Sequence, residues 1–192
     1  MTSATLLRPA VFLDRDGTMI ADVGYLDAID QIAFFPWTVD AIRLLNRGGF
    51  PVVVITNQSG VARGIFTESF VDEVHRAISA RVEAGGAHVD AYYYCPHHPD
   101  GSVAAFASVC DCRKPGRALV DRAAADLGID PERSFMVGDR WLDVTLGGAM
   151  HGRGILVRTG VGAREEAHPL PGVTADAIVD NLAAAASWIL SR

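Results

Sequence analysis

The residues best suited to chemistry near the start of the chain follow a short apolar run. Val11-Phe12-Leu13 leads directly into Asp14-Arg15-Asp16-Gly17-Thr18, so two carboxylates stand one residue apart, in front of a glycine. Such a run is typical of a buried strand, and the Asp-Gly pair indicates a turn. In a loop after a strand, Asp14 and Asp16 can hold a small hard cation such as Mg²⁺, and a carboxylate there can attack phosphorus. Taken alone, the motif is equally compatible with an ordinary turn.

Three further polar clusters occur next to other predicted elements. Thr56-Asn57-Gln58-Ser59-Gly60 follows a second apolar run, Gly138-Asp139-Arg140 follows a later one, and Arg113-Lys114 precedes a predicted helix. In parallel α/β sheets, ligands bind beyond the carboxyl ends of the strands. Chance placement would scatter such groups over both edges of the sheet. The pattern therefore predicts an active site at one edge.

The acidic residues suit the hydrolysis of a phosphate monoester in two displacements, which requires a nucleophile and an acid/base. We interpret Asp14 as the nucleophile and Asp16 as the group that protonates the leaving alkoxide and then deprotonates water. Asp139, together with Asp14 and the backbone carbonyl of Asp16, would complete a Mg²⁺ site. The alternative for Asp139 is a helix N-cap.

The remaining polar residues can hold the phosphoryl oxygens, which need several positive or hydrogen-bonding groups around them. Lys114 would neutralise both the crowded carboxylates and the phosphoryl charge. The Thr56 hydroxyl and the Asn57 backbone amide would donate hydrogen bonds. The alternative for Lys114 is a solvated surface charge, which is the usual state of a lysine.

The elements that must position these groups alternate between strand-like and helix-like runs, which predicts a three-layer α/β fold with a parallel central sheet. A single domain over residues 1–192 is expected, because neither a repeat nor a long linker interrupts the chain. The predicted strands are 10–13, 51–55, 89–94, 134–137 and 154–157, and the predicted helices are 37–46, 68–84, 118–127 and 175–190.

Composition narrows the class of protein. The 192 residues are 49% apolar, enough for a sizeable core, and the formal charge of −6 disfavours nucleic acid as a partner. No apolar run approaches the roughly 20 residues of a membrane span, and Met1 to Ala10 shows no apolar leader core. We therefore expect a cytoplasmic monomer that binds neither nucleic acid nor a membrane.

All three cysteines lie in one segment, at Cys95, Cys110 and Cys112. With His97 they supply three thiolates and one imidazole, a complete tetrahedral set for a structural Zn²⁺. This predicts a zinc loop over about 95–112 that leads into the basic pair. The alternatives are His98 in place of His97, free buried cysteines, or a Cys110–Cys112 disulfide.

The complete set of motifs resembles the haloacid-dehalogenase (HAD) phosphatases, in the same order and over most of the chain. The resemblance implies a Rossmann-like sheet and Mg²⁺-dependent phosphoryl transfer through an aspartyl-phosphate. Because only a short stretch separates Thr18 from Trp37, we expect no cap domain after the first motif. The motifs are Asp14-x-Asp16-Gly17-Thr18, Thr56-Asn57, Lys114 and Gly138-Asp139-x-x-x-Asp143.

The zinc loop makes the chain similar to two branches of that family, the D-glycero-D-manno-heptose 1,7-bisphosphate 7-phosphatases and the histidinol-phosphatases. The heptose branch implies removal of the C7 phosphate of a sugar bisphosphate during nucleotide-heptose synthesis. It also implies substrate contacts by Asp22, Val23, Gly24, Tyr25, Thr56, Asn57, Gln58, Ser59, Arg113 and Lys114. A guanidinium grips phosphate bidentately, which suits Arg113 to a second phosphate.

One residue departs from the pattern of the heptose branch. Arg140 stands where the heptose enzymes often carry Lys, and its backbone carbonyl is a further candidate Mg²⁺ ligand. The competing hypothesis from another class is a zinc-stabilised module without catalysis that contacts nucleic acid through Arg113, Lys114 and Arg117.

Overall fold

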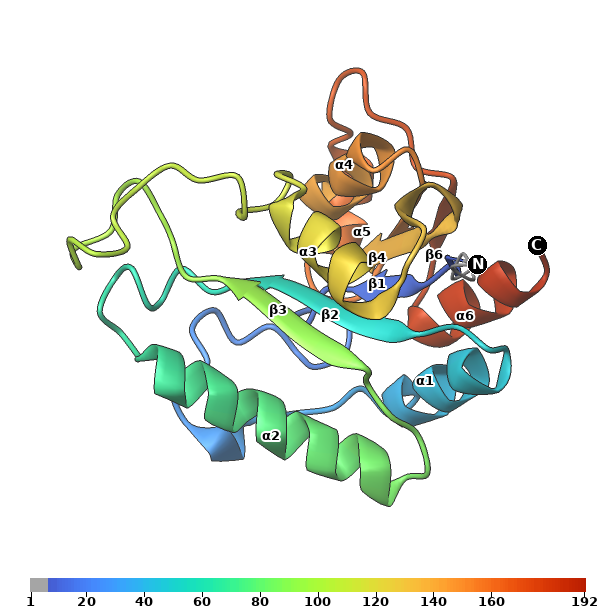
Figure 1. The fold of residues 1–192 in the computed structure, drawn as a ribbon, viewed down its shortest axis with the longest axis horizontal. Coiled ribbons are helices and arrows are strands. Elements are labelled where there is room, and N and C mark those ends of the chain that lie inside the picture. Colours follow the sequence, from blue (N-terminus) through green and yellow to red (C-terminus); the bar gives the residue numbers. More distant parts are fainter. Residues whose placement is uncertain (1–6) are drawn as a thin grey trace, which may run out of the picture.

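Six parallel strands form one sheet at the centre of the computed structural model, which describes residues 7–192 (Figure 1). The order across the sheet is β3-β2-β1-β4-β5-β6, so β1 and β4 are neighbours although they lie far apart in the sequence. The strand order reverses between β1 and β4, because β2 and β3 follow on one side of β1 and β5 and β6 follow on the other side of β4. Open α/β sheets bind ligands at such a switch point. The strands are β1 (Val11–Leu13), β2 (Val52–Asn57), β3 (Ala91–Cys95), β4 (Phe135–Gly138), β5 (Arg153–Val157) and β6 (Ala177–Val179).

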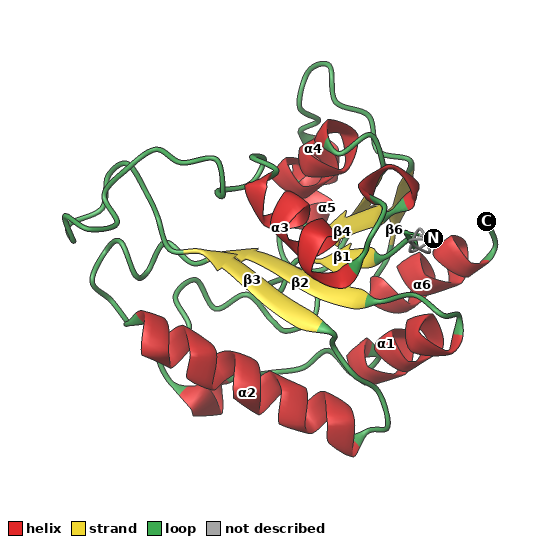
Figure 2. Ribbon diagram, in the orientation of Figure 1, coloured by secondary structure: helices red, strands yellow, loops and turns green. Residues whose placement is uncertain are grey.

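Helices cover both faces of this sheet, which confirms the predicted three-layer α/β fold (Figure 2). On one face lie α1 (Thr38–Arg47), α2 (Glu68–Ala84) and α6 (Leu182–Leu190), and on the other α3 (Ala118–Leu127) and α4 (Trp141–Ala149). The short α5 (Gly162–Ala167) follows β5. Between Thr18 and α1 the only helical element is the single turn η1 (Ile29–Gln31), and a second turn, η2 (Pro131–Arg133), precedes β4.

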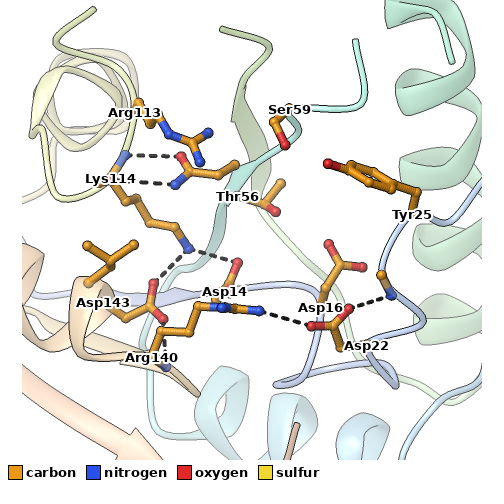
Figure 3. Close-up of a pocket in the computed structure, with 13 residues that line it drawn as sticks. Asp14, Asp16, Asp22, Tyr25, Thr56, Ser59, Arg113, Lys114, Arg140 and Asp143 are labelled. Atoms are coloured by element: carbon orange, nitrogen blue, oxygen red, sulfur yellow. Dashed lines mark hydrogen bonds and ion pairs between the residues drawn. The ribbon is translucent and has the colours of Figure 1, made fainter. Parts of the chain in front are cut away.

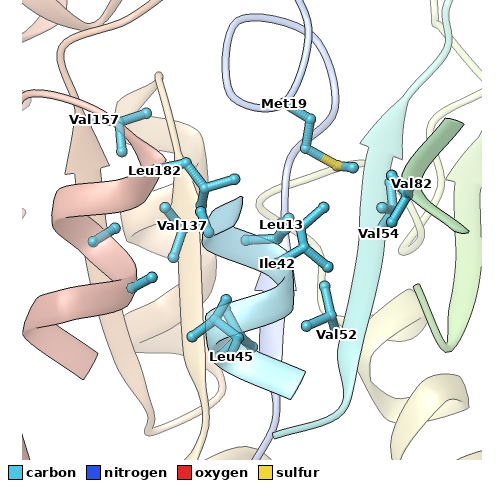
Figure 4. Packing of buried hydrophobic residues seen from close by; sticks show 14 of the residues in the cluster. Leu13, Met19, Ile42, Leu45, Val52, Val54, Val82, Val137, Val157 and Leu182 are labelled. Atoms are coloured by element: carbon cyan, nitrogen blue, oxygen red, sulfur yellow. The ribbon is translucent and has the colours of Figure 1, made fainter. Parts of the chain in front are cut away.

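The central strands are apolar on both sides because both sides are covered. On β1, Val11 and Leu13 pack toward α1, α2 and α6, whereas Phe12 packs toward α3. Figure 4 shows Leu13 beside Ile42 of α1, with Val54 of β2 close by. Complete burial of each such side chain stabilises the fold by about 1.5–3 kcal/mol. The loops after β1 and β2 therefore start from a rigid, close-packed platform.

The ends of two helices follow directly from local sequence. The Thr67 hydroxyl oxygen accepts a hydrogen bond from the Phe70 amide at 3.2 Å and caps α2, as its position before the helix predicts. Gly128 adopts the left-handed conformation with φ of 65° and ends α3 at Leu127, the predicted boundary.

The predicted helix over 175–190 is wrong in its first half. Ala177–Val179 instead forms β6, which pairs with β5 at the edge of the sheet, and the helix begins only at Leu182. The β-branched pair Ile178-Val179 favours a strand. The Asn181 side chain accepts a hydrogen bond from the Ala184 amide at 3.0 Å, so it caps α6 and separates the two elements.

The expectations about membranes and leaders are tested only in part. Within residues 7–192, none of the helices combines the length and the apolar character needed to cross a bilayer. The first six residues of the stretch examined for a leader, and of the predicted 1–192 domain, lie outside the described range.

Two adjacent glycines in α4 provide a test of the packing between this helix and β5. A Cβ on Gly147 would lie 2.6 Å from the Gly154 Cα of β5, whereas a Cβ on Gly148 would meet nothing within 4 Å. We expect Gly147→Ala to lower the free energy of unfolding by about 1–3 kcal/mol through overpacking. Gly148→Ala should raise it by roughly 0.5–1 kcal/mol, because alanine favours the helix. Urea unfolding of both variants checks this, and equal stabilities would contradict it.

Candidate active site

The predicted polar clusters meet in one pocket at the carboxyl edge of the sheet, with a volume of about 370 Å³ (Figure 3). Its walls come from the loops after β1, β2 and β4 and from the segment before α3. The prediction that these clusters share one edge is therefore confirmed. The predicted residues that line the pocket are Asp14, Asp16, Asp22, Gly24, Tyr25, Thr56, Asn57, Ser59, Arg113, Lys114 and Arg140.

The buried ammonium of Lys114 lies at the floor of this pocket. Its Nζ atom is 2.8 Å from Asp14 Oδ1 and 2.7 Å from Asp143 Oδ1, and it donates a hydrogen bond to the Ile55 carbonyl at 3.0 Å. Burial disfavours the charged lysine, but the two carboxylates outweigh burial and raise the pKa of Lys114 above its ordinary value. Lys114 is therefore a fixed positive charge beside Asp14, and the alternative of a solvated lysine is wrong.

Asp139 is fully buried, with one hydrogen-bonded oxygen and a second oxygen that lies 3.9 Å from Arg140 Nε. The Val161 backbone amide donates to its Oδ2 at 2.9 Å, whereas its Oδ1 accepts no hydrogen bond from residues 7–192. A Cβ on Gly17 or on Gly160 would lie 2.1 Å from Oδ2, so glycine at both positions makes room for this carboxylate. The N-cap of α4 is Arg140, so the N-cap alternative for Asp139 is not observed.

The acidic cluster carries more negative charge than the protein neutralises. Ligand atoms of Asp14, Asp139 and Asp143 lie within 4.8 Å of one another, and Lys114 is the ammonium that pairs with two of them. Burial and then the nearby Asp14 charge raise the pKa of Asp139 to about 8, and burial raises that of Asp143 to about 6. The free Asp139 oxygen and the carboxylate donors fit a hard divalent cation such as Mg²⁺.

Asp16 lies beside this cluster and is fixed by its neighbours. The Gln58 side-chain amide donates to Asp16 Oδ2 at 3.0 Å and to the Thr56 hydroxyl at 2.9 Å. On its other side, Arg15 Nη2 lies 3.0 Å from Asp16 Oδ2. Asp16 thus presents a partly exposed carboxylate to the pocket, where it can exchange a proton with a bound molecule.

Asn57 and Arg113 hold the basic segment in place. The Lys114 backbone amide donates to Asn57 Oδ1 at 3.0 Å, and Asn57 Nδ2 donates to the Lys114 carbonyl at 3.4 Å. Arg113 Nη1 donates to the His97 carbonyl at 3.3 Å, which joins the pocket wall to the cysteine loop.

The cysteine loop gathers its four predicted ligands at one point. The sulfur atoms of Cys95, Cys110 and Cys112 are 3.1 to 3.5 Å apart, and His97 Nδ1 is 3.3 Å from Cys112 Sγ. Thiolates around tetrahedral Zn²⁺ are about 3.8 Å apart given Zn–S bonds of ~2.3 Å, slightly longer than these separations. The cysteines are free, so the disulfide alternative is wrong. The set fits Zn²⁺, whereas His98 contacts Arg63 instead.

Two of the predicted contact residues, Val23 and Gln58, do not line the pocket. Val23 is exposed and does not line the pocket, although its neighbours Asp22 and Gly24 do. Gln58 is buried behind Asp16. Arg140 Nη2 reaches across the pocket to Asp22 Oδ2 at 3.2 Å, a contact drawn in Figure 3.

Two side chains in the site, Asp143 and Arg15, belong to the predicted motifs but had no role predicted for them. Asp143 binds Lys114 and accepts a hydrogen bond from the Arg140 amide at 3.2 Å. Its spacing from Asp139, one helical turn, was the available signal. Arg15 is buried behind Asp16, and its position between the two motif aspartates gave no indication of this.

Two of the three cations named in the nucleic-acid hypothesis are engaged within the protein. Lys114 is buried between carboxylates, and Arg117 pairs with Asp121 at 2.8 Å. A nucleic-acid surface needs exposed cations for phosphate contacts.

Comparisons with known proteins agree with this chemistry. A family model described as HAD-hydrolase-like matches residues 111–185. The chain is 45% identical over 153 residues to D-glycero-beta-D-manno-heptose-1,7-bisphosphate 7-phosphatase of Yersinia pestis, covering 79% of this chain and 81% of that protein. Identity to the enzyme of the same name from Escherichia coli K12 is 43% over 176 residues, which is 91% of this chain and 90% of that one.

A solved structure is similar over the whole fold. It is the D,D-heptose 1,7-bisphosphate phosphatase of B. bronchiseptica in complex with magnesium and phosphate. The TM-score is 0.83 at 31% identity, and the match covers 95% of this chain and 98% of that one.

The raised pKa of Asp139 predicts how the metal-free protein responds to pH. The folded carboxyl binds a proton up to about pH 8, whereas the unfolded one releases it near pH 4. Proton binding by Asp139 therefore contributes fully to the free energy of unfolding below about pH 4, and this contribution is lost as the pH rises toward 8. With a chelator present at pH 8, the melting temperature of Asp139→Asn should be several degrees higher than that of the unchanged protein. At pH 5 the difference between the two melting temperatures should be smaller.

Melting curves with and without Mg²⁺ complete this test. The unchanged protein should gain stability from Mg²⁺, and Asp139→Asn should not. The exposed Asp30→Asn serves as the control and should behave as the unchanged protein. A lower melting temperature for Asp139→Asn at pH 8 in chelator, or an intact Mg²⁺ effect, would contradict the interpretation.

Proposed function

The chain belongs to the D-glycero-beta-D-manno-heptose-1,7-bisphosphate 7-phosphatase family of HAD-like hydrolases, and we propose that it removes the C7 phosphate from that sugar bisphosphate. It is a phosphoric monoester hydrolase, and the proposed products are heptose 1-phosphate and inorganic phosphate. One observation carries the proposal: Asp14 lies in an ion pair with buried Lys114 at the floor of a pocket, in a chain 43% identical to such an enzyme.

In the first displacement, a carboxylate oxygen of Asp14 attacks the C7 phosphorus while the bond to the sugar oxygen breaks. Lys114, 2.8 Å from Asp14, offsets the negative charge that collects on the phosphoryl oxygens. Asp16 donates its proton to the departing sugar oxygen. The Thr56 hydroxyl and the backbone amide of Asn57 donate hydrogen bonds to the phosphoryl oxygens. The products of this step are an Asp14 aspartyl-phosphate and the sugar alcohol.

In the second displacement, Asp16, now a carboxylate, takes a proton from a water molecule that attacks the phosphorus of the Asp14 ester. The bond from phosphorus to the Asp14 oxygen breaks, which releases phosphate and restores both carboxyl groups. The Gln58 amide and Arg15 keep Asp16 over the same point in both steps.

We assign the magnesium site to Asp14, Asp139, the backbone carbonyl of Asp16 and, at its rim, the backbone of Arg140. When bound, Mg²⁺ supplies the positive charge that lets a phosphate dianion approach the Asp14 carboxylate. Support comes from the excess of buried carboxylates and from the magnesium in the B. bronchiseptica structure. Asp143 would act through its ion pair with Lys114.

The second phosphate of the substrate requires a second cation at the pocket wall. Arg113 lines the pocket and is oriented by a single bond to the His97 carbonyl. We assign it to the C1 phosphate. The loop of Asp22, Val23, Gly24 and Tyr25 and the segment through Ser59 would then contact the sugar hydroxyls. The beta anomer is the proposed substrate form, as in the names of the relatives.

The cysteine cluster is proposed to hold one structural Zn²⁺ in a loop inserted in a single phosphatase domain over 1–192. Its four protein ligands leave no open coordination position for water, which suits a structural rather than a catalytic ion. The Arg113 to His97 bond links this loop to the substrate pocket.

Kinetics with defined substrates test the proposed activity. Purified protein with Mg²⁺ should release phosphate from heptose 1,7-bisphosphate with a higher kcat/KM than from histidinol phosphate, and faster for the beta than for the alpha anomer. Asp14→Asn should lose at least about 10³-fold in kcat, because it removes the nucleophile. Asp30→Asn is the matched control. Unchanged turnover in Asp14→Asn would exclude the mechanism, and a preference for histidinol phosphate would exclude the proposed substrate.

Metal analysis tests the proposed zinc site with two neighbouring histidines. His97→Ala should hold well under one equivalent of zinc, because it removes a ligand. His98→Ala should keep about one equivalent, since that ring contacts Arg63 at 3.3 Å rather than the thiols. Loss of zinc in His98→Ala with retention in His97→Ala would reverse the assignment.

A further inference from the structure

Arg15, between the two motif aspartates, is a charged residue that is almost fully buried, with 2% of its side chain exposed. Its Nε lies 3.2 and 3.1 Å from the two oxygens of Asp16, and its Nη2 lies 3.0 Å from Oδ2. The Nε and Nη2 atoms of the guanidinium therefore both bind the Asp16 carboxylate. Arginine is rarely buried unless it is paired, and its planar fork fixes the orientation of the group that it binds.

The far side of the same guanidinium faces a buried histidine of α2. His75 Nε2 is 3.5 Å from Arg15 Nη1, at the outer limit of a hydrogen bond. The imidazole stacks on Tyr92 with ring centroids 4.6 Å apart and meets Tyr94 edge-on at 5.8 Å. Burial and then the Arg15 charge lower the pKa of His75 to about 3. The ring is therefore neutral in the folded protein, and Nε2 is available to accept a hydrogen bond.

These contacts form a continuous row from the helix to the pocket. Tyr92 and Tyr94 hold the His75 ring, His75 faces Arg15, and Arg15 holds Asp16. Asp16 precedes Gly17, whose φ of 79° is a conformation that few other residues adopt. The Asp16 carboxylate lies between the Arg15 guanidinium and the Gln58 side-chain amide, which donates to its Oδ2 at 3.0 Å.

We propose that Arg15 and His75 are positioning residues that aim the Asp16 carboxylate at the leaving-group oxygen. The inference rests on the proposed function, in which Asp16 protonates the departing sugar oxygen. A general acid contributes only when it is within hydrogen-bond reach of the atom that takes the proton. Arg15 supplies the orienting fork, and His75 holds the fork against rotation away from Asp16.

A positioning role predicts a loss that depends on the leaving group. A sugar oxygen is a strong base and departs with a proton, whereas p-nitrophenolate is a weak base and departs without one. The value of kcat/KM reports the steps up to departure of the leaving group, so it isolates the acid function of Asp16 from its later function as a base. A merely structural role would reduce kcat/KM for both substrates equally.

The experiment measures kcat/KM for heptose 1,7-bisphosphate and for p-nitrophenyl phosphate, with Mg²⁺ present. Asp16→Asn sets the largest attainable difference between the substrates. Arg15→Met should lose about 10²-fold with the sugar substrate, within the range of general acid catalysis, and less than about a fifth of that with the aryl phosphate. Arg15→Lys, which keeps the charge but not the fork, should lie between Arg15→Met and the unchanged protein.

Two substitutions at His75 separate hydrogen bonding from packing. His75→Gln keeps an acceptor without the ring, and His75→Phe keeps a ring without the acceptor. We expect a several-fold loss confined to the sugar substrate in His75→Phe and a smaller one in His75→Gln. Zinc content and melting temperature identify any variant that fails to fold. If Arg15→Met does not fold, Arg15→Lys and the His75 pair decide the question.

The outcomes distinguish this inference from the function on which it rests. Equal losses on both substrates, or an impaired His75→Gln beside an unimpaired His75→Phe, would overturn the positioning role alone. An unchanged protein that is inactive on both substrates would overturn the proposed function and the inference with it.

Discussion

The buried ammonium of Lys114 is the interaction on which the rest of the site depends. Three buried carboxylates, from the loops after β1 and β4 and from α4, converge on one point, and an uncompensated buried charge costs several kcal/mol. Lys114 forms ion pairs with Asp14 and Asp143 and donates a hydrogen bond to the Ile55 carbonyl, and these three contacts hold its ammonium group in place. The Asp14 side chain is thereby held in place at the floor of the pocket. The Asp139 oxygen that accepts no hydrogen bond from residues 7–192 makes the site receptive to a divalent cation.

The chain supports Lys114 from two directions. On one side, the Asn57 side chain at the end of β2 binds the backbone amide and carbonyl of Lys114. The central sheet therefore fixes the position of the Lys114 backbone. On the other side lies the cysteine cluster. Cys112 is two residues before Lys114 in the chain, and Arg113 between them donates a hydrogen bond to the His97 carbonyl. The cysteine cluster is thus tied to the catalytic pocket by a very short covalent path. This connection gives a physical reason why four candidate metal ligands gather in this loop.

The sequence predicted the parts of this arrangement that depend on local patterns. Apolar runs located the strands, and the residue types after β1, β2 and β4 indicated a phosphate site at one edge. Contacts between distant segments were not predictable in this way. The pairing of Lys114 with Asp143 depends on β1 and β4 being neighbours, and the Arg15 to His75 contact joins residues 60 positions apart. The strand β6 was missed because the Asn181 cap that separates it from α6 was not identified from the sequence.

The central claim is that Asp14 becomes phosphorylated and is then freed by water, and the stereochemical course at phosphorus tests it most directly. A heptose 1,7-bisphosphate analogue with a chiral thiophosphate at C7 would be hydrolysed in isotopically labelled water, and the configuration of the released thiophosphate determined. Each in-line displacement inverts phosphorus, so two displacements predict net retention. Net inversion would show a single attack by water and would contradict the account of Asp14 as the nucleophile.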